Sequence, residues 1–171
     1  MTRIPIVNEQ DEIVCYKERE EATREDIRRI TSLFLFNEKG ETLLARRHPN
    51  KLISPNRWGP AVEGTVDEGY DYDATIVKEM EEELGLKTIQ PIFISKEFYA
   101  TLEAKRFCSY YYAVVSENIK FTLQESEVSE VRWISISDLK RWFLEKPEEF
   151  LLSFPIKIKL LEKTYEHLNK N

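Results

Sequence analysis

The apolar positions follow a strand-like period in some parts of the chain and a helical period in others. A nearly continuous apolar run at residues 30–36, ITSLFLF, is typical of a buried strand, and residues 37–40, NEKG, predict the hairpin turn after it. Five further stretches have strand-like patterns and lie at residues 42–46, 58–62, 91–102, 106–115 and 131–134. The stretches at 91–102 and 106–115 are long and close together, so they predict an antiparallel pair.

Other segments predict a leading hairpin and several helices. Residues 4–7 and 12–16 predict the hairpin, and the charged residues 18–28 predict a helix with arginine at its C-terminal end. A further helix is predicted to begin at Ser137, and residues 156–168 have the spacing of a final amphipathic helix. Strands with helices on both faces predict an α/β/α sandwich with a mixed β-sheet.

Residues 64–86, GTVDEGYDYDATIVKEMEEELGL, predict a glycine-bearing loop followed by a helix with two unlike sides. Its apolar residues fall on one side and its glutamates on the other: Val77, Met80 and Leu84 against Glu79, Glu82 and Glu83. Carboxylates three or four residues apart on a helix are neighbours and repel one another. Bound Mg²⁺ or Mn²⁺ reverses that repulsion, because such cations take oxygen ligands.

A run of glutamates on a helix usually marks a solvated face, and this remains the alternative. The flanking residues favour a fixed acidic site instead. Gly64 and Gly69 bracket a turn, Asp71 or Asp73 can cap the start of the helix, and Gly85 ends it just past the last glutamate.

The same stretch resembles the sequence box of the Nudix hydrolases, G-x5-E-x7-R-E-U-x-E-E-x-G-U, where U is a bulky apolar residue. The matching positions are Gly64, Glu79, Met80, Glu82, Glu83, Gly85 and Leu86. Two positions differ, because Tyr70 stands where the family has glutamate and Lys78 where it has arginine. Lysine keeps the charge but lacks the planar fork that grips a carboxylate by two bonds. The differences leave open a catalytically weakened Nudix module that binds ligand or regulates.

The resemblance implies a function and a set of site residues. Glu79, Glu82 and Glu83 would be catalytic residues that bind Mg²⁺ (or Mn²⁺), with the carbonyl of Gly64 as a further ligand. The implied reaction is metal-dependent hydrolysis of a diphosphate bond, and we expect the substrate to be a nucleoside diphosphate linked to another group. The resemblance also implies the Nudix fold.

The division of the chain follows from the same comparison. We expect one Nudix domain over residues 1–171, with a leading hairpin and helix at 1–29, the Nudix core at 30–143 and a C-terminal helical segment at 144–171.

Residues outside the box supply further candidates. Hydrolysis needs a base for the attacking water or another carboxylate for a second metal, and Glu127 is the catalytic candidate, with Glu125 as the alternative. Arg46 and Arg47 can clamp phosphate through charge-assisted hydrogen bonds, and Trp58 can stack on a flat group of the substrate. The competing interpretations are a solvated acidic loop, ordinary surface charge and core packing.

Three flanking segments, residues 5–14, 42–64 and 125–139, resemble the Nudix branch related to isopentenyl-diphosphate isomerase. That isomerase keeps a catalytic cysteine on the strand approaching the box and a metal site rich in histidine. Here residues 61–63 are Ala-Val-Glu, and the histidines are His48 and His167. We therefore expect a hydrolase built on an isomerase-like frame, with an isomerase-like enzyme as the alternative.

Composition limits the cellular compartment and the classes of binding partner that we expect. A net charge of −6 argues against nucleic acid and an anionic membrane as partners, since both are bound through basic patches, but not against a small diphosphate bound through metal. Cys15 and Cys108 lack zinc spacing and predict reduced thiols. With no signal-like or bilayer-length apolar run, we expect a cytoplasmic protein. Nudix proteins are often dimers, which leaves a homodimer open.

Overall fold

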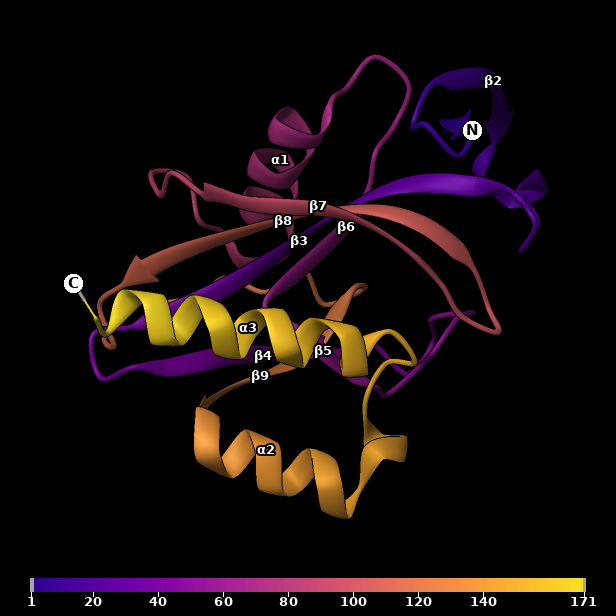
Figure 1. Ribbon diagram of the computed structural model, residues 1–171. Coiled ribbons are helices and arrows are strands. Elements are labelled where there is room, and N and C mark those ends of the chain that lie inside the picture. The colour runs from indigo at the N-terminus through magenta and orange to yellow at the C-terminus, as the bar shows by residue number, and fades with distance from the viewer. Residues whose placement is uncertain (1, 171) are drawn as a thin grey trace.

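The computed structural model describes residues 2–170, and in this range nine strands form one mixed sheet with helices on both faces (Figure 1). The strands are β1 (Arg3–Val7), β2 (Ile13–Glu18), β3 (Ile27–Asn37), β4 (Glu41–Arg47), β5 (Trp58–Pro60), β6 (Val62–Thr65), β7 (Ile92–Ala100), β8 (Lys105–Val115) and β9 (Val128–Ser135). The helices are α1 (Tyr72–Leu84), α2 (Ile136–Glu145) and α3 (Phe154–Leu168), with short 3₁₀ segments at Arg19–Glu21 and Pro147–Glu149. The predicted α/β/α arrangement with a mixed sheet is confirmed.

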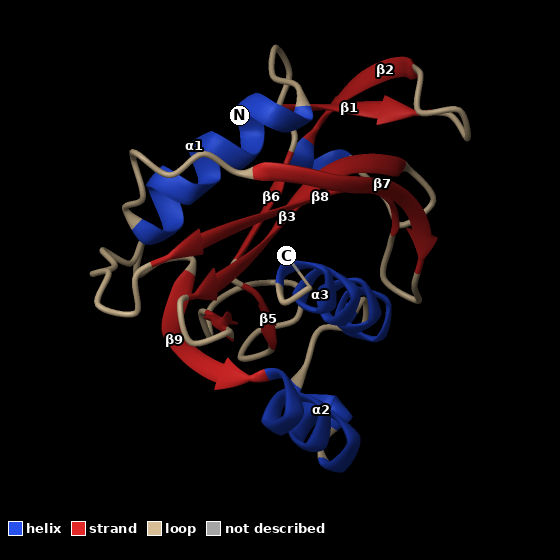
Figure 2. Cartoon of the chain, turned by 60° about the vertical axis from the view of Figure 1, so that its left-hand side comes forward, coloured by secondary structure: helices blue, strands red, loops and turns tan. Residues whose placement is uncertain are grey.

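The central strand is β3, which pairs with four others. It runs antiparallel to β1, β4 and β6 and parallel to β8, and the parallel pair makes the sheet mixed. The predicted antiparallel pair of β7 and β8 is present, and β9 and β5 both pair with β4. Figure 2 shows α1 on one face of this sheet and α2 and α3 on the other.

Alternation along β3 divides the core into two clusters, because successive side chains of a strand point to opposite faces. Leu33 and Leu35 pack with Met80 and Leu84 of α1, as predicted. The predicted two sides are only partly correct, because Val77 is 42% exposed and Glu83 is buried. Phe34 and Phe36 pack with Phe154 and other residues of α3. Each face of the sheet therefore has its own helix cover, and the acidic side of α1 is left free to line a site.

Local signals set both ends of α1. The Asp71 side chain accepts a hydrogen bond from the backbone N–H of Ala74 at 2.8 Å, so the predicted N-cap is present. Gly85 has φ of 74°, and its N–H donates to the Glu81 carbonyl at 3.0 Å. Leu86 donates to Met80, which completes a glycine C-cap of the kind the sequence predicts.

Several predicted boundaries are wrong. The helix expected over residues 18–28 does not form, because β2 continues to Glu18 opposite Arg3 and β3 already begins at Ile27. Pairing across the sheet outweighs the helical composition here. Ala61 also separates the strand predicted at 58–62 into β5 and β6, and α2 is capped by Ser135 rather than beginning at Ser137.

The leading hairpin is fastened to the rest of the molecule through Asp11, a buried residue with φ of 63°. Its carboxylate accepts hydrogen bonds from Arg29 at 2.7 Å and from the Tyr72 hydroxyl at 3.0 Å, and it also contacts the Lys96 ammonium. These partners belong to β3, α1 and β7. One turn residue thus connects the hairpin to the helix that carries the box glutamates.

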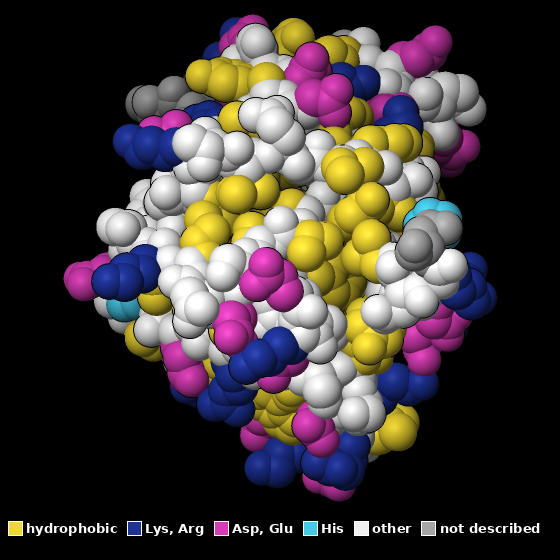
Figure 3. All heavy atoms as spheres, turned by 90° about the vertical axis from the view of Figure 1, so that its left-hand side faces the viewer, with side chains coloured by type: hydrophobic (Ala, Val, Ile, Leu, Met, Phe, Trp, Pro, Cys, Tyr) yellow, Lys and Arg dark blue, Asp and Glu magenta, His cyan; other side chains and the backbone are white. Residues whose placement is uncertain are grey.

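Some apolar side chains remain on the surface where β7 begins and β8 ends. Ile92, Phe93 and Val114 are each about half exposed, and Figure 3 shows apolar side chains gathered on the side of the molecule where these strand ends lie. Within residues 2–170, the helices are all too short or too polar to cross a bilayer.

Candidate functional site

The site begins where β6 passes under α1. Gly64 pairs with Thr31 of β3 and lies against the Glu79 side chain. A Cβ added to Gly64 would come within 2.2 Å of the Cγ of Glu79 and 2.5 Å of its Cδ, so a side chain there would displace Glu79. The glycine therefore forms a cradle for the first box glutamate.

Glu83 is the most deeply placed of the box glutamates, with 8% of its surface exposed. Burial raises the pKa of its carboxyl well above the usual range, and the neighbouring Glu79 and Glu127 carboxylates raise it further. Burial also raises the pKa of Glu79, against the lowering effect of Lys78. Burial first, and the neighbouring carboxylates second, thus disfavour the ionised form of Glu83.

Backbone hydrogen bonds hold the loop that carries Glu127 next to the end of α1. Glu127 lies 44 positions further along the chain than Glu83. The N–H of Thr122 donates to the Leu84 carbonyl at 3.0 Å, and that of Gln124 donates to the Glu83 carbonyl at 3.1 Å. Glu127 lines the pocket and its carboxylate contacts the Lys51 ammonium. Glu125 is exposed and does not line the pocket, so the structure favours Glu127 of the two candidates.

Of the three box glutamates, Glu83 lines the pocket, whereas Glu79 and Glu82 do not. Glu82 has a side chain that is 46% exposed, and the Lys78 ammonium contacts its carboxylate at 3.0 Å. The same ammonium is 3.5 Å from Glu79 and 3.9 Å from Asp67. Burial lowers the pKa of Lys78, but these contacts outweigh burial and raise it overall. Lys78 therefore holds carboxylates as a point charge, while Tyr70 is exposed and adds no carboxylate.

The predicted phosphate clamp occupies the end of β4. Arg46 and Arg47 both line the pocket. Arg47 donates through Nε to the Ile53 carbonyl at 3.2 Å, and burial lowers the pKa of its guanidinium. Arg46 donates to the Asn56 carbonyl at 3.2 Å and lies 3.6 Å from Glu130. Arg47 is thus the more enclosed of the two cations.

The predicted stacking role of Trp58 is not supported. Trp58 is only 4% exposed and packs edge-on with Trp142, with ring centroids 5.4 Å apart. The Arg132 guanidinium lies over its ring at 4.9 Å. The structure places this side chain in the core, because α2 folds back over β5.

The pocket also contains an ion pair that the sequence alone does not reveal. Glu63 of β6 lines the pocket, and its carboxylate accepts a hydrogen bond from the ammonium of Lys157 on α3. Lys157 is fully buried, at 0% exposure. Burial, together with the nearby Arg47 guanidinium, favours the neutral amine and lowers the pKa of Lys157, whereas the carboxylate in contact favours the charged form. No local signal could reveal a partner 94 positions away.

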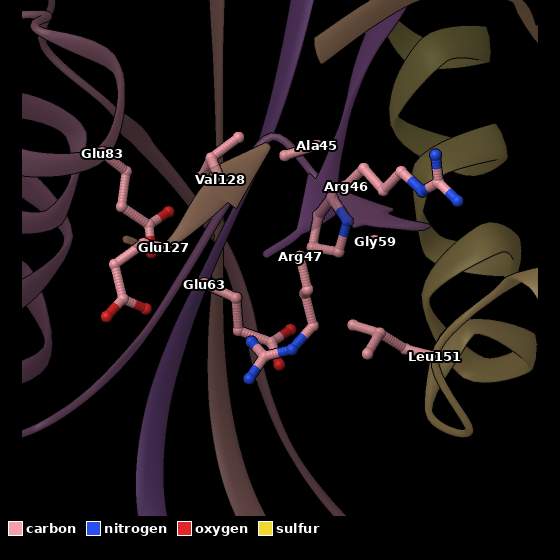
Figure 4. Close-up of a pocket in the computed structure, with 10 residues that line it drawn as sticks. Ala45, Arg46, Arg47, Gly59, Glu63, Glu83, Glu127, Val128 and Leu151 are labelled. Atoms are coloured by element: carbon pink, nitrogen blue, oxygen red, sulfur yellow. The ribbon is translucent and has the colours of Figure 1, made fainter. Parts of the chain in front are cut away.

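Figure 4 shows how these side chains share one pocket. Glu83 and Glu127 come from one side, Arg47 and Glu63 meet near the middle, and Leu151 lies toward α3. The complete lining consists of Ala45, Arg46, Arg47, Gly59, Pro60, Glu63, Glu83, Glu127, Val128 and Leu151. The arrangement can bind an anion through arginine and a cation through glutamates at the same place.

The donor set suits a hard divalent cation. Glu79, Glu83 and Glu127 offer carboxylate oxygens, and a cation would relieve the repulsion that Glu79 and Glu127 exert on Glu83. The Gly64 cradle leaves Glu79 room beside the backbone of β6. Across residues 2–170, however, no three His, Cys, Asp or Glu side chains converge closely enough to form a ready-made metal site. By the chemistry of their side chains, Glu79, Glu83 and Glu127 are nevertheless suited to bind a divalent cation.

Neither cysteine belongs to the site. Cys15 is exposed on β2, and Cys108 is buried on β8, where burial raises the pKa of its thiol. His48 lies in a loop, where its Nδ1 accepts a hydrogen bond from the N–H of Asn50 at 3.2 Å. The pocket formed by the described residues is lined by neither cysteine nor histidine.

A family model described as the NUDIX domain matches residues 26–154. The chain therefore belongs to the Nudix hydrolase family, as the box predicts.

The chain is also similar to individual members of the family. The uncharacterized Nudix hydrolase YfcD of Escherichia coli is 29% identical over 137 residues, covering 80% of this chain and 75% of that protein. The prenyl-diphosphate phosphatase of Methanosarcina mazei is 31% identical over 132 residues, covering 72% and 73%. Across the relatives, the match spans between 63% and 75% of their lengths.

The fold has a counterpart among solved structures. The crystal structure of DR0079 from Deinococcus radiodurans superimposes with a TM-score of 0.78 at 22% identity, covering 94% of this chain and 98% of that one. At this identity the likeness shows the fold alone.

Proposed function

We propose that this chain is a metal-dependent hydrolase of a diphosphate bond in a nucleoside diphosphate linked to another group. The observation that carries the proposal is the joint lining of one pocket by Glu83, Glu127 and Arg47. Carboxylates and a guanidinium at one place suit a substrate that is anionic and reaches the protein with a cation.

Mg²⁺ (or Mn²⁺), held by Glu79, Glu82 and Glu83 with the Gly64 carbonyl, would neutralise the diphosphate oxygens and lower the pKa of a bound water. Glu79 and Glu82 would have to exchange their contacts with Lys78 for this role, since neither of them lines the pocket. The raised pKa of Glu83 in the absence of a cation is consistent with a residue that needs one.

Other residues of the chain act on the substrate directly. Arg47 binds a phosphate oxygen through charge-assisted hydrogen bonds, and its contact with the Ile53 carbonyl limits how far it moves. Glu127 accepts a proton from the attacking water, and Lys51 orients its carboxylate. Arg46, which already contacts Asn56 and Glu130, binds the substrate at the rim.

The direct test is metal-dependent phosphate release from nucleotide sugars, dinucleoside polyphosphates and nucleoside triphosphates, with EDTA as the control. We expect turnover of a nucleoside diphosphate derivative with Mg²⁺ or Mn²⁺ and none with EDTA. Turnover that survives EDTA would contradict metal dependence, and no turnover of any compound would contradict the hydrolase proposal itself.

A weakened binding module is the second candidate, favoured by the contact of Lys78 with both Glu79 and Glu82. If Lys78 and Tyr70 merely weaken the site, the double change Lys78→Arg and Tyr70→Glu should raise turnover more than either change alone, since neighbouring residues couple. A double variant slower than wild type would indicate a site rebuilt for binding.

Isomerisation of isopentenyl diphosphate is not expected, since neither Cys15 nor Cys108 lines the pocket. Deuterium in the allylic product, formed in deuterated water above the rate without protein, would overturn this expectation.

A further inference from the structure

The ion pair of Glu63 and Lys157 gives the pocket a charged group that hydrolysis of a diphosphate does not require. Lysine is almost never fully buried unless it is paired, and Lys157 has no exposed surface. Its ammonium contacts the Glu63 carboxylate and lies 5.9 Å from the centre of the Tyr99 ring. The Glu63 side chain keeps 23% of its surface exposed and lines the pocket. The ammonium is thus hidden behind the carboxylate, and the carboxylate is what a ligand meets.

The pairing of β6 with β3 decides which part of a ligand meets Glu63. Glu63 pairs with Ser32, and Gly64 pairs with Thr31. Successive residues of a strand face opposite sides, so Gly64 faces α1 with Glu79, and Glu63 faces α3 with Lys157. The glutamates expected to bind metal therefore lie on one side of β6, and the Glu63 carboxylate lies on the other.

A carboxylate on that side selects by hydrogen bonding. It repels phosphate and accepts hydrogen bonds from hydroxyl or N–H groups, and Lys157 limits its freedom to turn away. A prenyl chain offers no donor and would remove water from the carboxylate without replacing its hydrogen bonds, which is unfavourable. Lys157 also lies beyond residues 26–154, the part of the chain that the family model matches.

We propose that Glu63 is a specificity-determining residue that accepts hydrogen bonds from a hydroxyl- or N–H-bearing group attached to the diphosphate, and that Lys157 is the positioning residue that fixes it. The inference rests on the proposed hydrolase function and deepens it. It assigns to this chain a sugar- or nucleoside-linked diphosphate, in contrast to the prenyl diphosphate in the name of its Methanosarcina relative.

The test compares two kinds of substrate in the full-length protein with Mg²⁺. One is the best substrate among ADP-ribose, UDP-glucose and diadenosine tetraphosphate, and the other is geranyl diphosphate. The measured quantity is the selectivity, meaning the ratio of kcat/KM for the first to kcat/KM for the second. Wild type should favour the donor-bearing compound, because a site built around a polar contact rejects analogues that lack it.

Variants separate positioning from folding. Glu63→Gln and Lys157→Met should each lower the selectivity about tenfold or more, chiefly by raising KM for the donor-bearing substrate, and Lys157→Arg should restore part of it. Lys159→Met removes a neighbouring exposed lysine of α3 and should leave the selectivity unchanged. If Lys157→Met fails to fold, the double change Glu63→Met and Lys157→Met removes both charges at similar volume and should shift selectivity toward geranyl diphosphate.

The outcomes distinguish this inference from the function on which it rests. Equal losses on both substrates, unchanged selectivity in folded variants, or a wild-type preference for geranyl diphosphate would overturn the roles of Glu63 and Lys157 while leaving a diphosphate hydrolase. A wild-type protein that hydrolyses none of the compounds would overturn the proposed function, and the inference would fall with it.

Discussion

At the scale of single residues, a side chain that serves the proposed activity can make the folded protein less stable, and Glu83 is the clearest case. Its carboxylate is buried beside Glu79 and Glu127, which raises its pKa well above the usual range. In the folded protein without a cation, the ionised form of Glu83 is therefore unfavourable. Such a residue is expected to matter for activity more than for folding.

Replacing Glu83 by glutamine should lower kcat/KM at least about 100-fold, because metal coordination supplies several kcal/mol of transition-state stabilisation. The fold should remain, since the change is nearly isosteric. Steady-state kinetics with Mg²⁺ and a circular dichroism spectrum check both points. Glu125→Gln serves as the matched control, because Glu125 is exposed and outside the pocket. A fully active Glu83→Gln variant would refute the metal assignment.

The raised pKa of Glu83 also predicts how stability depends on pH. The folded state holds the Glu83 proton more tightly than the unfolded chain does. The contribution of Glu83 is therefore fully present below the ordinary carboxyl pKa of about 4.3 and is lost as pH rises through the folded value. Between about pH 5 and about pH 8 in EDTA, wild type should lose melting temperature relative to Glu83→Gln. A difference that stays constant, as expected between wild type and the exposed-site variant Glu125→Gln, would count against this explanation.

At the scale of elements, the contact of β6 with α1 sets the position of Glu79. A Cβ at Gly64 would lie 2.2 Å from the Cγ of Glu79, a distance that real contacts do not allow. Gly69, in the loop between β6 and α1, has open space around the position of its Cβ and φ of 86°. The two glycines therefore serve different ends, one through contact and the other through backbone conformation.

Changing Gly64 to alanine should lower kcat/KM about tenfold or more, because Glu79 must leave its place beside the strand. Changing Gly69 to alanine should cost about 1 kcal/mol of stability through its positive φ and leave the glutamate in place. Kinetics and urea unfolding of both variants separate the two effects. Equal loss of activity in both would show that the loop, and not the cradle, positions Glu79.

Elements governed by local chemistry could be predicted from the sequence. The box helix α1 has its cap at Asp71 and its stop at Gly85, both within a turn of the helix ends, and both were readable. The helix expected at residues 18–28 failed, because β1 and β8 offer pairing partners that composition does not show. The predicted stacking role of Trp58 is not supported for the same reason, since the residue that covers it, Trp142, lies 84 positions away.

The site could be predicted only in part. The box supplied Glu79 and Glu83 because their spacing on one helix is a local pattern, and Arg47 and Glu127 were candidates whose place in the pocket needed the fold. The role of Glu63 was invisible, because its meaning depends on Lys157 of the last helix. The sequence shows which side chains have suitable chemistry, but it does not show which residues that are distant along the chain contact one another.

At the scale of the whole molecule, the leading hairpin depends on one buried carboxylate. Asp11 contacts Arg29, Tyr72 and Lys96, which lie on three different elements. Removing one partner of a buried ionic cluster leaves the others uncompensated.

Changing Asp11 to asparagine should cost about 3 kcal/mol in the free energy of unfolding, measured in urea. Asparagine tolerates the positive φ of this position, so the loss would report the charge rather than the backbone. Glu9→Gln, an exposed change in the same turn, should stay within about 0.5 kcal/mol of wild type. A similar loss in both variants would assign the effect to the turn.

The placement of Glu63 and Gly64 on opposite faces of β6 has a consequence for how the protein can diverge. Substitutions facing α3 would alter which organic group is accepted, while substitutions facing α1 would alter the hydrolytic chemistry. Two adjacent residues thus affect two properties, the choice of organic group and the hydrolytic chemistry, which can change separately. Insertion of a single residue into β6 would exchange the two faces and abolish both traits at once. Residues of β6 can therefore be substituted far more readily than the length of the strand can change.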